Sequence, residues 1–234
     1  FLYAFLAAFD AGDAVAMARP GYPAYRNMLA ALGCEIVELP CGPQTRFQPT
    51  VAQLDALPEP PAGLIVASPA NPTGTMVGPE EITALSRWCE AHGTRFISDE
   101  IYHGITYGAP GTCAWTAGRS SIVVNSFSKY FSMTGWRIGW LLVPDELIDA
   151  VDRLAGNFTI CPPALSQLAR SRFPSPSKSP AATEAAPPFG TMTSESAVKE
   201  PRSFRRIATA PLMPPAARSR CPSSSKSPSM RELL

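Results

Sequence analysis

Residues 121–129 read Ser-Ile-Val-Val-Asn-Ser-Phe-Ser-Lys, an apolar run that ends in polar residues and a lysine. The run has the pattern of a buried β-strand, so Lys129 is predicted to follow a strand and not to lie on a charged surface. Lys129 is also the only lysine among the first 171 residues. Burial lowers the pKa of an amine, and a neutral amine can attack a carbonyl and form an imine. The stretch therefore predicts a reactive lysine; the alternative is a half-buried lysine whose ammonium group reaches the surface.

The natural partner of such an amine is an aldehyde cofactor that carries a phosphate. We expect Ser126 to offer its hydroxyl to that phosphate. Arg137, eight residues after Lys129, is expected to offer a planar guanidinium, which suits the geometry of a phosphate. The stretch around Lys129 thus predicts both the reactive group and part of a phosphate site.

Apolar runs and helical patterns alternate along the chain on the N-terminal side of this stretch and continue after it. Strands are expected at residues 13–18, 34–39, 63–67, 95–98, 121–125 and 138–143, and helices at residues 1–9, 25–32, 49–57, 79–92 and 144–154. This alternation predicts an α/β fold, a three-layer α/β/α domain with a mostly parallel, mixed sheet. Ligands of such sheets collect beyond the carboxyl ends of the strands. Asn71, Asp99 and Lys129 all follow predicted strands, so we expect them at one edge of the sheet.

The composition divides the chain into two parts. Residues 1–171 carry 10 Lys and Arg against 15 Asp and Glu, and they hold all four tryptophans. Residues 172–234 carry 10 Lys and Arg against 4 Asp and Glu, with 11 prolines and no apolar periodicity. We expect the first part to form one domain, and the second to be a tail that is disordered or of separate origin.

Several classes of function are not indicated. The first 171 residues contain no basic stripe for a nucleic acid. The six cysteines include no C-x-x-C pair and there are only two histidines, so neither a metal site nor a disulfide framework is expected, and we predict a reducing, cytoplasmic setting. The apolar residues 1–9 are too short to span a bilayer, and they resemble a core helix entered partway along. We therefore expect no membrane association and a domain that is incomplete at both ends.

Four short motifs follow one another in the chain: Asn71-Pro72-x-Gly74, Asp99-x-x-Tyr102, Ser126-x-x-Lys129 and Arg137-x-Gly139. Each motif is weak alone, since Asn-Pro-x-Gly is usually only a turn. Together, and in this order, they resemble the pyridoxal-phosphate-dependent class I and II aminotransferases of fold type I, over roughly residues 1–168. The resemblance implies that residues 1–171 are the large, cofactor-binding domain of such an enzyme, truncated at its N-terminal side.

The resemblance implies three catalytic residues. Lys129 would form a Schiff base with the aldehyde of pyridoxal 5′-phosphate and would later move the substrate proton. Asp99 would keep the pyridine nitrogen protonated, so that the ring can accept electrons. Tyr102 would donate a hydrogen bond to the phenolic oxygen of the ring.

The resemblance also implies the remaining cofactor contacts. Asn71 would donate a second hydrogen bond to the phenolic oxygen, and Ser126 with Arg137 would bind the phosphate. Tyr22 would stack on the ring, whereas Tyr25, three residues later, is expected to be structural. The cofactor-binding set is therefore Lys129, Asn71, Asp99, Tyr102, Ser126, Arg137 and Tyr22.

The function that the resemblance implies is transfer of an amino group between an α-amino acid and a 2-oxo acid by a homodimeric enzyme. A carbon–sulfur lyase acting by β-elimination is an alternative, because the same residues serve both reactions. A catalytically inactive, truncated remnant is another. The glycine- and serine-rich turn that grips the phosphate in the family is not found, and nothing after Arg172 resembles the part of the family that binds the substrate α-carboxylate.

Overall fold

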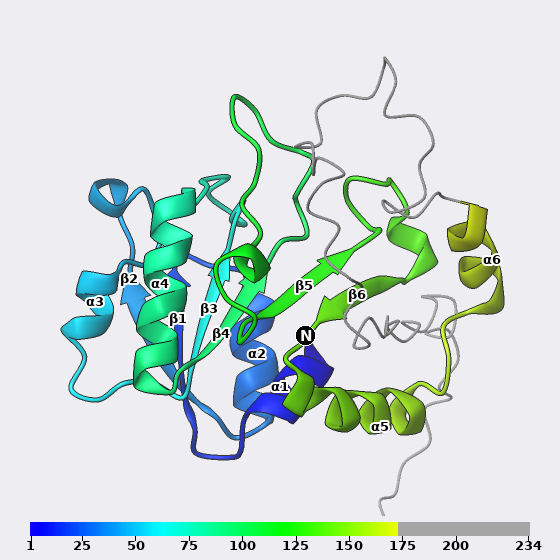
Figure 1. Ribbon diagram of the computed structural model, residues 1–234, viewed down its shortest axis with the longest axis horizontal. Coiled ribbons are helices and arrows are strands. Elements are labelled where there is room, and N and C mark those ends of the chain that lie inside the picture. The colour runs from blue at the N-terminus through cyan, green and yellow to red at the C-terminus, as the bar shows by residue number, and fades with distance from the viewer. Residues whose placement is uncertain (173–234) are drawn as a thin grey trace, which may run out of the picture.

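The computed structural model describes residues 1–172 of the 234-residue chain. Within these residues, six strands form one sheet in the order β2-β1-β3-β4-β5-β6 (Figure 1). Their bounds are β1 Ala14–Arg19, β2 Glu35–Pro40, β3 Gly63–Ala67, β4 Arg95–Asp99, β5 Ile122–Ser126 and β6 Gly139–Leu142. Strands β1 to β5 pair in parallel, and β6 runs antiparallel to β5. The prediction of a mostly parallel, mixed sheet is confirmed.

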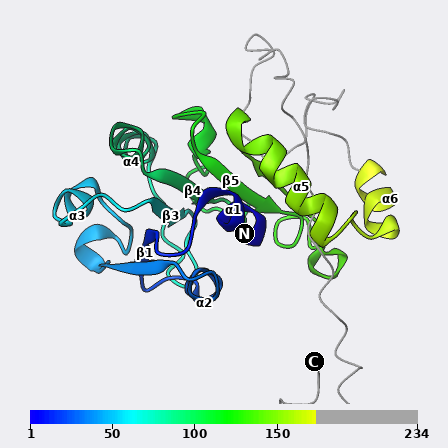
Figure 2. The same ribbon diagram turned by 90° about the horizontal axis from the view of Figure 1, so that it is seen from below.

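Helices cover both faces of the sheet. They are α1 Leu2–Ala8, α2 Pro23–Ala31, α3 Val51–Asp55, α4 Pro79–His92 and α5 Ile148–Phe158, whereas α6 Ala164–Arg172 lies to one side, beyond β6 (Figure 1). Helices α2 and α4 lie on opposite sides of the sheet (Figure 2). Successive side chains of a strand point to opposite faces, so each buried strand contributes to two cores. In β3, Ile65 packs with α1, α2 and α5, whereas its neighbours Leu64 and Val66 pack with α3 and α4. The predicted three layers are therefore present.

The local sequence explains why α4 begins and ends where it does. Pro79 occupies its first turn, where a missing N–H costs nothing, and two glutamates in the same turn favour the positive end of the helix dipole. The carboxylate of Glu81 accepts a hydrogen bond from the backbone N–H of Gly78 at 2.8 Å. Gly93 ends the helix with φ of 68°, a left-handed conformation that favours glycine. The helix delivers the chain directly to β4.

Three expectations about helices need correction. The helix predicted at residues 49–57 is shorter, because Thr50 caps it at Val51 and it ends at Asp55 before a proline cluster. The helix predicted at residues 144–154 starts as a 3-10 turn and extends as α5 to Phe158. Helix α6 was not predicted, and it includes Arg172, which the sequence placed in the tail. The expectation for residues 173–234 lies outside the described residues.

Residues 1–172 also lack certain features. No helix among them is long and apolar enough to cross a membrane. No group of three or more His, Cys, Asp or Glu residues in this part is arranged to hold a metal ion. The five cysteines of the described part are free thiols. These findings concern the described part of the chain alone.

A pair of glycine substitutions tests the packing at the β5–β6 edge. A Cβ atom on Gly139 would lie 2.6 Å from the backbone oxygen of Asn125 on β5, whereas one on Gly156 in α5 would meet no atom within 4 Å. We expect Gly139→Ala to destabilise the fold by about 1–3 kcal/mol. Gly156→Ala should stabilise it by about 0.5–1 kcal/mol, because alanine loses less backbone entropy in a helix. Urea unfolding followed by circular dichroism measures both, and equal midpoints would contradict the prediction.

Candidate functional site

Asp99 is the last residue of β4, and its side chain is buried at the carboxyl end of the sheet. One carboxylate oxygen, Oδ1, accepts a hydrogen bond from the backbone N–H of Ile101 at 3.1 Å. The other, Oδ2, accepts a hydrogen bond from the hydroxyl of Tyr25. Burial raises the pKa of the Asp99 carboxyl, and these two hydrogen bonds oppose the rise. The site is therefore centred on a buried acid that binds a proton more readily than an exposed aspartate does.

Two tyrosines of α2 and the turn before it lie beside this acid. Tyr25 is buried, and burial, followed by the charge of Asp99, raises the pKa of its phenol, with smaller contributions from Tyr22 and Tyr102. Tyr25 therefore stays protonated and donates to Asp99. The ring of Tyr22 meets that of Tyr25 edge to face, with centroids 5.4 Å apart, and Tyr22 remains 41% exposed. The exposed ring of Tyr22 can receive a flat ligand, whereas the Tyr25 ring cannot.

Lys129 lies in the loop that follows β5, and its Nζ is 5.6 Å from the centroid of the Tyr102 ring. Tyr102 comes three residues after Asp99, so the amine, the phenol and the acid belong to one region. The sequence predicted an amine removed from water, but Lys129 is exposed in the structure. The reason is that β5 ends at Ser126 and the chain then leaves the sheet, so the burial of the strand does not extend to its loop. Its exposure places the amine where a ligand can reach it.

Ser126 and Arg137 lie on two neighbouring segments. Ser126 pairs with Gly139 in the β5–β6 register, and the N–H of Phe127 donates to the carbonyl of Ile138 at 3.1 Å. The Ser126 hydroxyl oxygen accepts a hydrogen bond from the backbone N–H of Ser128 at 2.9 Å. Antiparallel pairing therefore brings the hydroxyl-bearing end of β5 next to the segment that carries Arg137.

The guanidinium of Arg137 is fixed by its own loop. Its Nη1 donates to the carbonyl of Thr134 at 2.7 Å. The backbone of Arg137 has φ of 53°, a left-handed conformation that is uncommon for a residue with a side chain. The phosphate contact of Arg137 stays a prediction.

Asn71 lies in the loop after β3, and this loop begins beside Asp99. The last residue of β3, Ala67, is in register with Asp99, and the N–H of Ser68 donates to the carbonyl of Asp99 at 3.1 Å. The buried side chain of Gln48 donates to the carbonyls of Ala67 at 3.1 Å and Thr75 at 2.9 Å. Gln48 thus fixes both sides of the loop. Sequence reasoning missed it, because it lies in an irregular segment without periodicity.

The sequence model of the family described as aminotransferase class I and II matches residues 1–179. This chain belongs to that family. The valine–pyruvate aminotransferase of Mycobacterium tuberculosis is 67% identical over 171 residues, which are 72% of this chain and 44% of that enzyme. The aspartate aminotransferase of Geobacillus stearothermophilus is 34% identical over 166 residues, which are 68% of this chain and 42% of that enzyme. The resemblance inferred from the four motifs is confirmed.

Solved aminotransferase structures share the fold. A crystal structure of an aminotransferase from Mycobacterium tuberculosis has a TM-score of 0.70 and 66% identity, over 72% of this chain and 44% of that one. The aspartate aminotransferase of Thermus thermophilus with maleate has a TM-score of 0.68 and 32% identity, over 72% of this chain and 45% of that one. The fold-type I assignment is therefore confirmed. This chain spans less than half the length of these relatives.

Within this aminotransferase fold, the structure connects most of the predicted site residues. Tyr25 donates to Asp99 and its ring contacts that of Tyr22, while the amine of Lys129 lies over the ring of Tyr102. The hydrogen bond from Tyr25 to Asp99 joins residues 74 positions apart. No local pattern could have predicted it, since a tyrosine on a helix usually indicates only a core position. The roles of these residues toward a cofactor stay predictions.

Replacing Tyr25 by phenylalanine tests its link to Asp99. The hydrogen bond from Tyr25 lowers the pKa of Asp99 against the effect of burial, so we expect Tyr25→Phe to raise that pKa further. A pH titration of the aspartate carboxyl carbons by NMR measures the shift. Tyr22→Phe is the matched control, because it also removes a phenol near the acid but not the hydrogen bond. Equal Asp99 titrations in the two variants would contradict the prediction.

Proposed function

We propose that this chain supplies the cofactor-binding part of an aminotransferase that uses pyridoxal 5′-phosphate to move an amino group between an α-amino acid and a 2-oxo acid. The proposal depends on one observation: Asp99 is buried at the carboxyl end of β4, and the amine of Lys129, beyond the carboxyl end of β5, lies 5.6 Å from the ring of Tyr102, three residues after that acid. When bound, the cofactor supplies an aldehyde that condenses with amines and a ring that accepts electrons from the substrate Cα.

The donor set fits the chemical groups of that cofactor. Asp99 has a raised pKa because it is buried, so its carboxylate is a strong acceptor for a protonated pyridine nitrogen. The phenol of Tyr102 can donate to the ring oxygen beside the aldehyde. Tyr25 and the N–H of Ile101 keep the carboxylate oriented, since each donates to a different oxygen. The acid and the phenol would thus each hold one polar group of the same aromatic ring.

Lys129 provides the base as well as the attachment point. Its primary amine is exposed beyond β5 and lies over the Tyr102 ring, where an aldehyde can reach it. Once a substrate amine has displaced it, Nζ would remove the proton from the substrate Cα and deliver it to the carbon that had been the cofactor aldehyde. Attachment of the cofactor and transfer of the proton both need a primary amine near the phenol, and Lys129 lies beside Tyr102.

The remaining contacts would anchor the cofactor. Ser126 and Arg137, on adjoining segments, would bind the phosphate through a hydroxyl and a guanidinium. Tyr22 would stack on the ring with its exposed face, and Asn71 would donate from the loop after β3. These assignments follow the family resemblance, and they are supported by the chain positions of the four residues, which adjoin the carboxyl ends of β1, β3 and β5.

The relative named valine–pyruvate aminotransferase is 67% identical to this chain, so we propose valine as the amino donor and pyruvate as the acceptor. We further propose that residues 1–171 form the large domain of the enzyme, that the enzyme acts as a homodimer, and that it works in the cytoplasm. No nucleic acid or membrane partner is part of this proposal.

The test is an absorption titration of the full chain with pyridoxal 5′-phosphate. We expect a visible band that saturates with cofactor and that is lost when valine is added, with 2-oxoisovalerate formed in equal amount. Pyruvate should then restore the band. A spectrum equal to that of free cofactor would refute cofactor binding. Ammonia released in place of amino-group transfer would instead indicate a lyase.

A further inference from the structure

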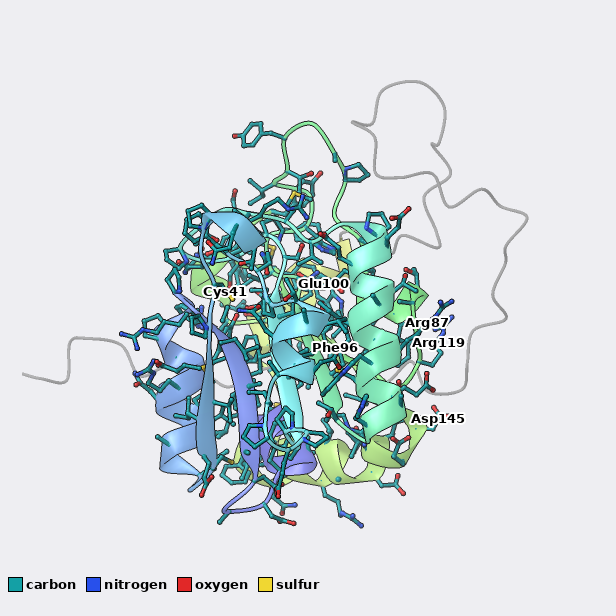
Figure 3. The ribbon with its side chains drawn as sticks, turned by 90° about the vertical axis from the view of Figure 1, so that its left-hand side faces the viewer. Cys41, Arg87, Phe96, Glu100, Arg119 and Asp145 are labelled. Carbon is teal, nitrogen blue, oxygen red and sulfur yellow. The ribbon has the colours of Figure 1, made fainter. Side chains whose placement is uncertain are left out.

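Glu100 is a second buried acid, next to Asp99, and the proposed reaction does not use it. The residue is only 2% exposed, although a glutamate is rarely buried without partners. Its backbone N–H donates to the carbonyl of Val124 on β5 at 2.9 Å. Figure 3 shows Glu100 inside the molecule, above Phe96 and below the loops at the carboxyl edge of the sheet. A buried carboxylate in this position needs a structural or functional reason.

The Glu100 carboxylate contacts both ends of one loop. We call residues 101–113 the Tyr102 loop; it rises above the sheet between β4 and β5 (Figure 1). Oε1 of Glu100 accepts hydrogen bonds from the N–H of Ala114 at 2.8 Å and from the hydroxyl of Ser98 at 3.1 Å. Oε2 lies 3.4 Å from Nδ1 of His103. One carboxylate therefore joins the start of the loop to the residue that follows its end.

A thiol completes the environment of Glu100. Burial, and then the charge of Glu100 and a hydrogen bond to it, raise the pKa of Cys113 to about 12. The thiol therefore stays protonated and acts as a donor to the carboxylate. With Ser98 and Ala114, it makes three donor groups around one acid, and Nδ1 of His103 lies 3.4 Å from the same carboxylate. Such a buried charge is stabilised only while its partners stay in place, so it resists loosening of the loop base.

The Tyr102 loop also packs against the segment that carries Lys129. A Cβ atom on Gly104 would overlap the ring of Tyr130, which follows Lys129 in the chain, and one on Gly111 would lie 2.6 Å from the His103 ring. By contrast, the tip of the loop is open, with Tyr107 93% exposed. The loop is thus packed at its base and exposed at its tip. Tyr102 belongs to the packed base.

We propose that Glu100 is a positioning residue, whose carboxylate clamps both ends of the Tyr102 loop and so holds the Tyr102 phenol beside Lys129. Tyr102 lies between Glu100 and His103, which are also joined through the N–H of His103 and the carbonyl of Glu100 at 3.0 Å. The part of Tyr102 in catalysis rests on the proposed function. The clamp does not, since all its contacts are within this chain.

The first experiment needs no cofactor. In the full chain, the ring current of Tyr102 shifts the NMR signal of the Lys129 CεH₂ group, and Tyr102→Leu identifies that shift. In Glu100→Gln, one carboxylate oxygen is replaced by an NH₂ group, which cannot accept hydrogen bonds from the surrounding donors. The base of the loop should then loosen and the Tyr102 ring should move away from Lys129. We therefore expect the Lys129 signal to move toward its position in Tyr102→Leu. Amide exchange of residues 101–114 should also rise, by about 10-fold. Glu81→Gln on α4 is the matched control and should change neither. An unchanged Lys129 signal in Glu100→Gln would overturn the proposal.

The second experiment separates positioning from general stability. With pyridoxal 5′-phosphate bound, Glu100→Gln should shift the pH midpoint of the visible band in the same direction as Tyr102→Phe, while Glu81→Gln should not. If Glu100→Gln raises amide exchange of residues 101–114 but leaves the pH midpoint of the visible band unchanged, the positioning role is refuted. If no variant and no parent chain binds the cofactor, the proposed function fails, whereas the Lys129 signal still decides the clamp. If Glu100→Gln does not fold, His103→Phe keeps a ring against Gly111, loses the Nδ1 contact and tests the same signal.

Discussion

Replacing Lys129 by alanine is expected to abolish the visible absorption of the bound cofactor and to lower the rate of amino-group transfer by at least about 10³-fold. The amine is the proposed attachment point and the proposed base, and loss of a general base alone typically costs about 10²–10⁴-fold. Lys129 is exposed and its loop lies outside the sheet, so the change should leave the free energy of unfolding nearly unchanged. The loss would therefore be chemical and not structural.

Two comparisons make this prediction sharp. Lys129→Arg keeps a cation near the Tyr102 ring but has no primary amine that can condense, so it should behave like alanine. Borohydride reduction of the parent chain with cofactor should leave a cofactor-derived mass on the peptide containing Lys129. The chain has only three other lysines, Lys178, Lys199 and Lys226, which serve as internal controls. Labelling of those lysines alone, or a normal band in Lys129→Arg, would show that the assignment is wrong.

The change Asp99→Asn is expected to lower amino-group transfer by at least about 10²-fold, comparable with the loss of one preorganised electrostatic partner at an active site. Asparagine has nearly the same shape as aspartate but carries no charge, so it cannot hold a proton on the pyridine nitrogen. The N–H of Ile101 would still have the amide oxygen to donate to, and the Tyr25 hydroxyl can rotate so that it accepts a hydrogen bond from the amide NH₂ group that replaces Oδ2. Steady-state kinetics with valine and pyruvate measures the effect, and activity within a factor of three of the parent would contradict it.

Without cofactor, Asp99→Asn should be more stable than the parent chain, and this difference in the free energy of unfolding should grow as the pH rises. Burial raises the pKa of Asp99 above its ordinary value of 3.8, so the folded state binds the proton more tightly than the unfolded state. The stability that the protonated acid contributes is complete below pH 3.8 and is lost as the pH rises through the higher folded pKa. Asparagine does not titrate, so it loses no stability in this range. The free energy of unfolding of Asp99→Asn relative to the parent should therefore increase up to the folded pKa of Asp99 and stay constant above it.

Thermal melts from acid to neutral pH measure this difference in stability. Asp145→Asn, which changes an exposed acid in the 3-10 turn before α5, is the matched control and should show no such trend. Bound cofactor should reduce the difference in melting temperature between Asp99→Asn and the parent, since a protonated pyridine nitrogen would give the Asp99 charge a partner. A parent chain that becomes more stable than Asp99→Asn as the pH rises would show that the sign is wrong.

Much of the fold could be predicted because it depends on local patterns. The unbroken apolar run of β3 and the proline and glycine that bound α4 each follow from a few neighbouring residues. Helix α6 was missed because its sequence, Ala-Leu-Ser-Gln-Leu-Ala-Arg-Ser-Arg, adjoins the proline-rich tail and shows little apolar periodicity. The exposure of Lys129 was also missed, since an apolar strand gives no information about the loop after it.

What the sequence alone determined is the order of the strands along the chain and the four motifs that follow β3, β4 and β5, because each depends on residues within one or two turns of the backbone. Only the tertiary structure decided that Tyr25 donates to Asp99, that Gln48 holds the Asn71 loop, and that Glu100 contacts both ends of the Tyr102 loop. The physical reason is that these hydrogen bonds connect side chains whose distance is set by how helices and loops pack on the sheet. Burial then makes each bond costly to lose.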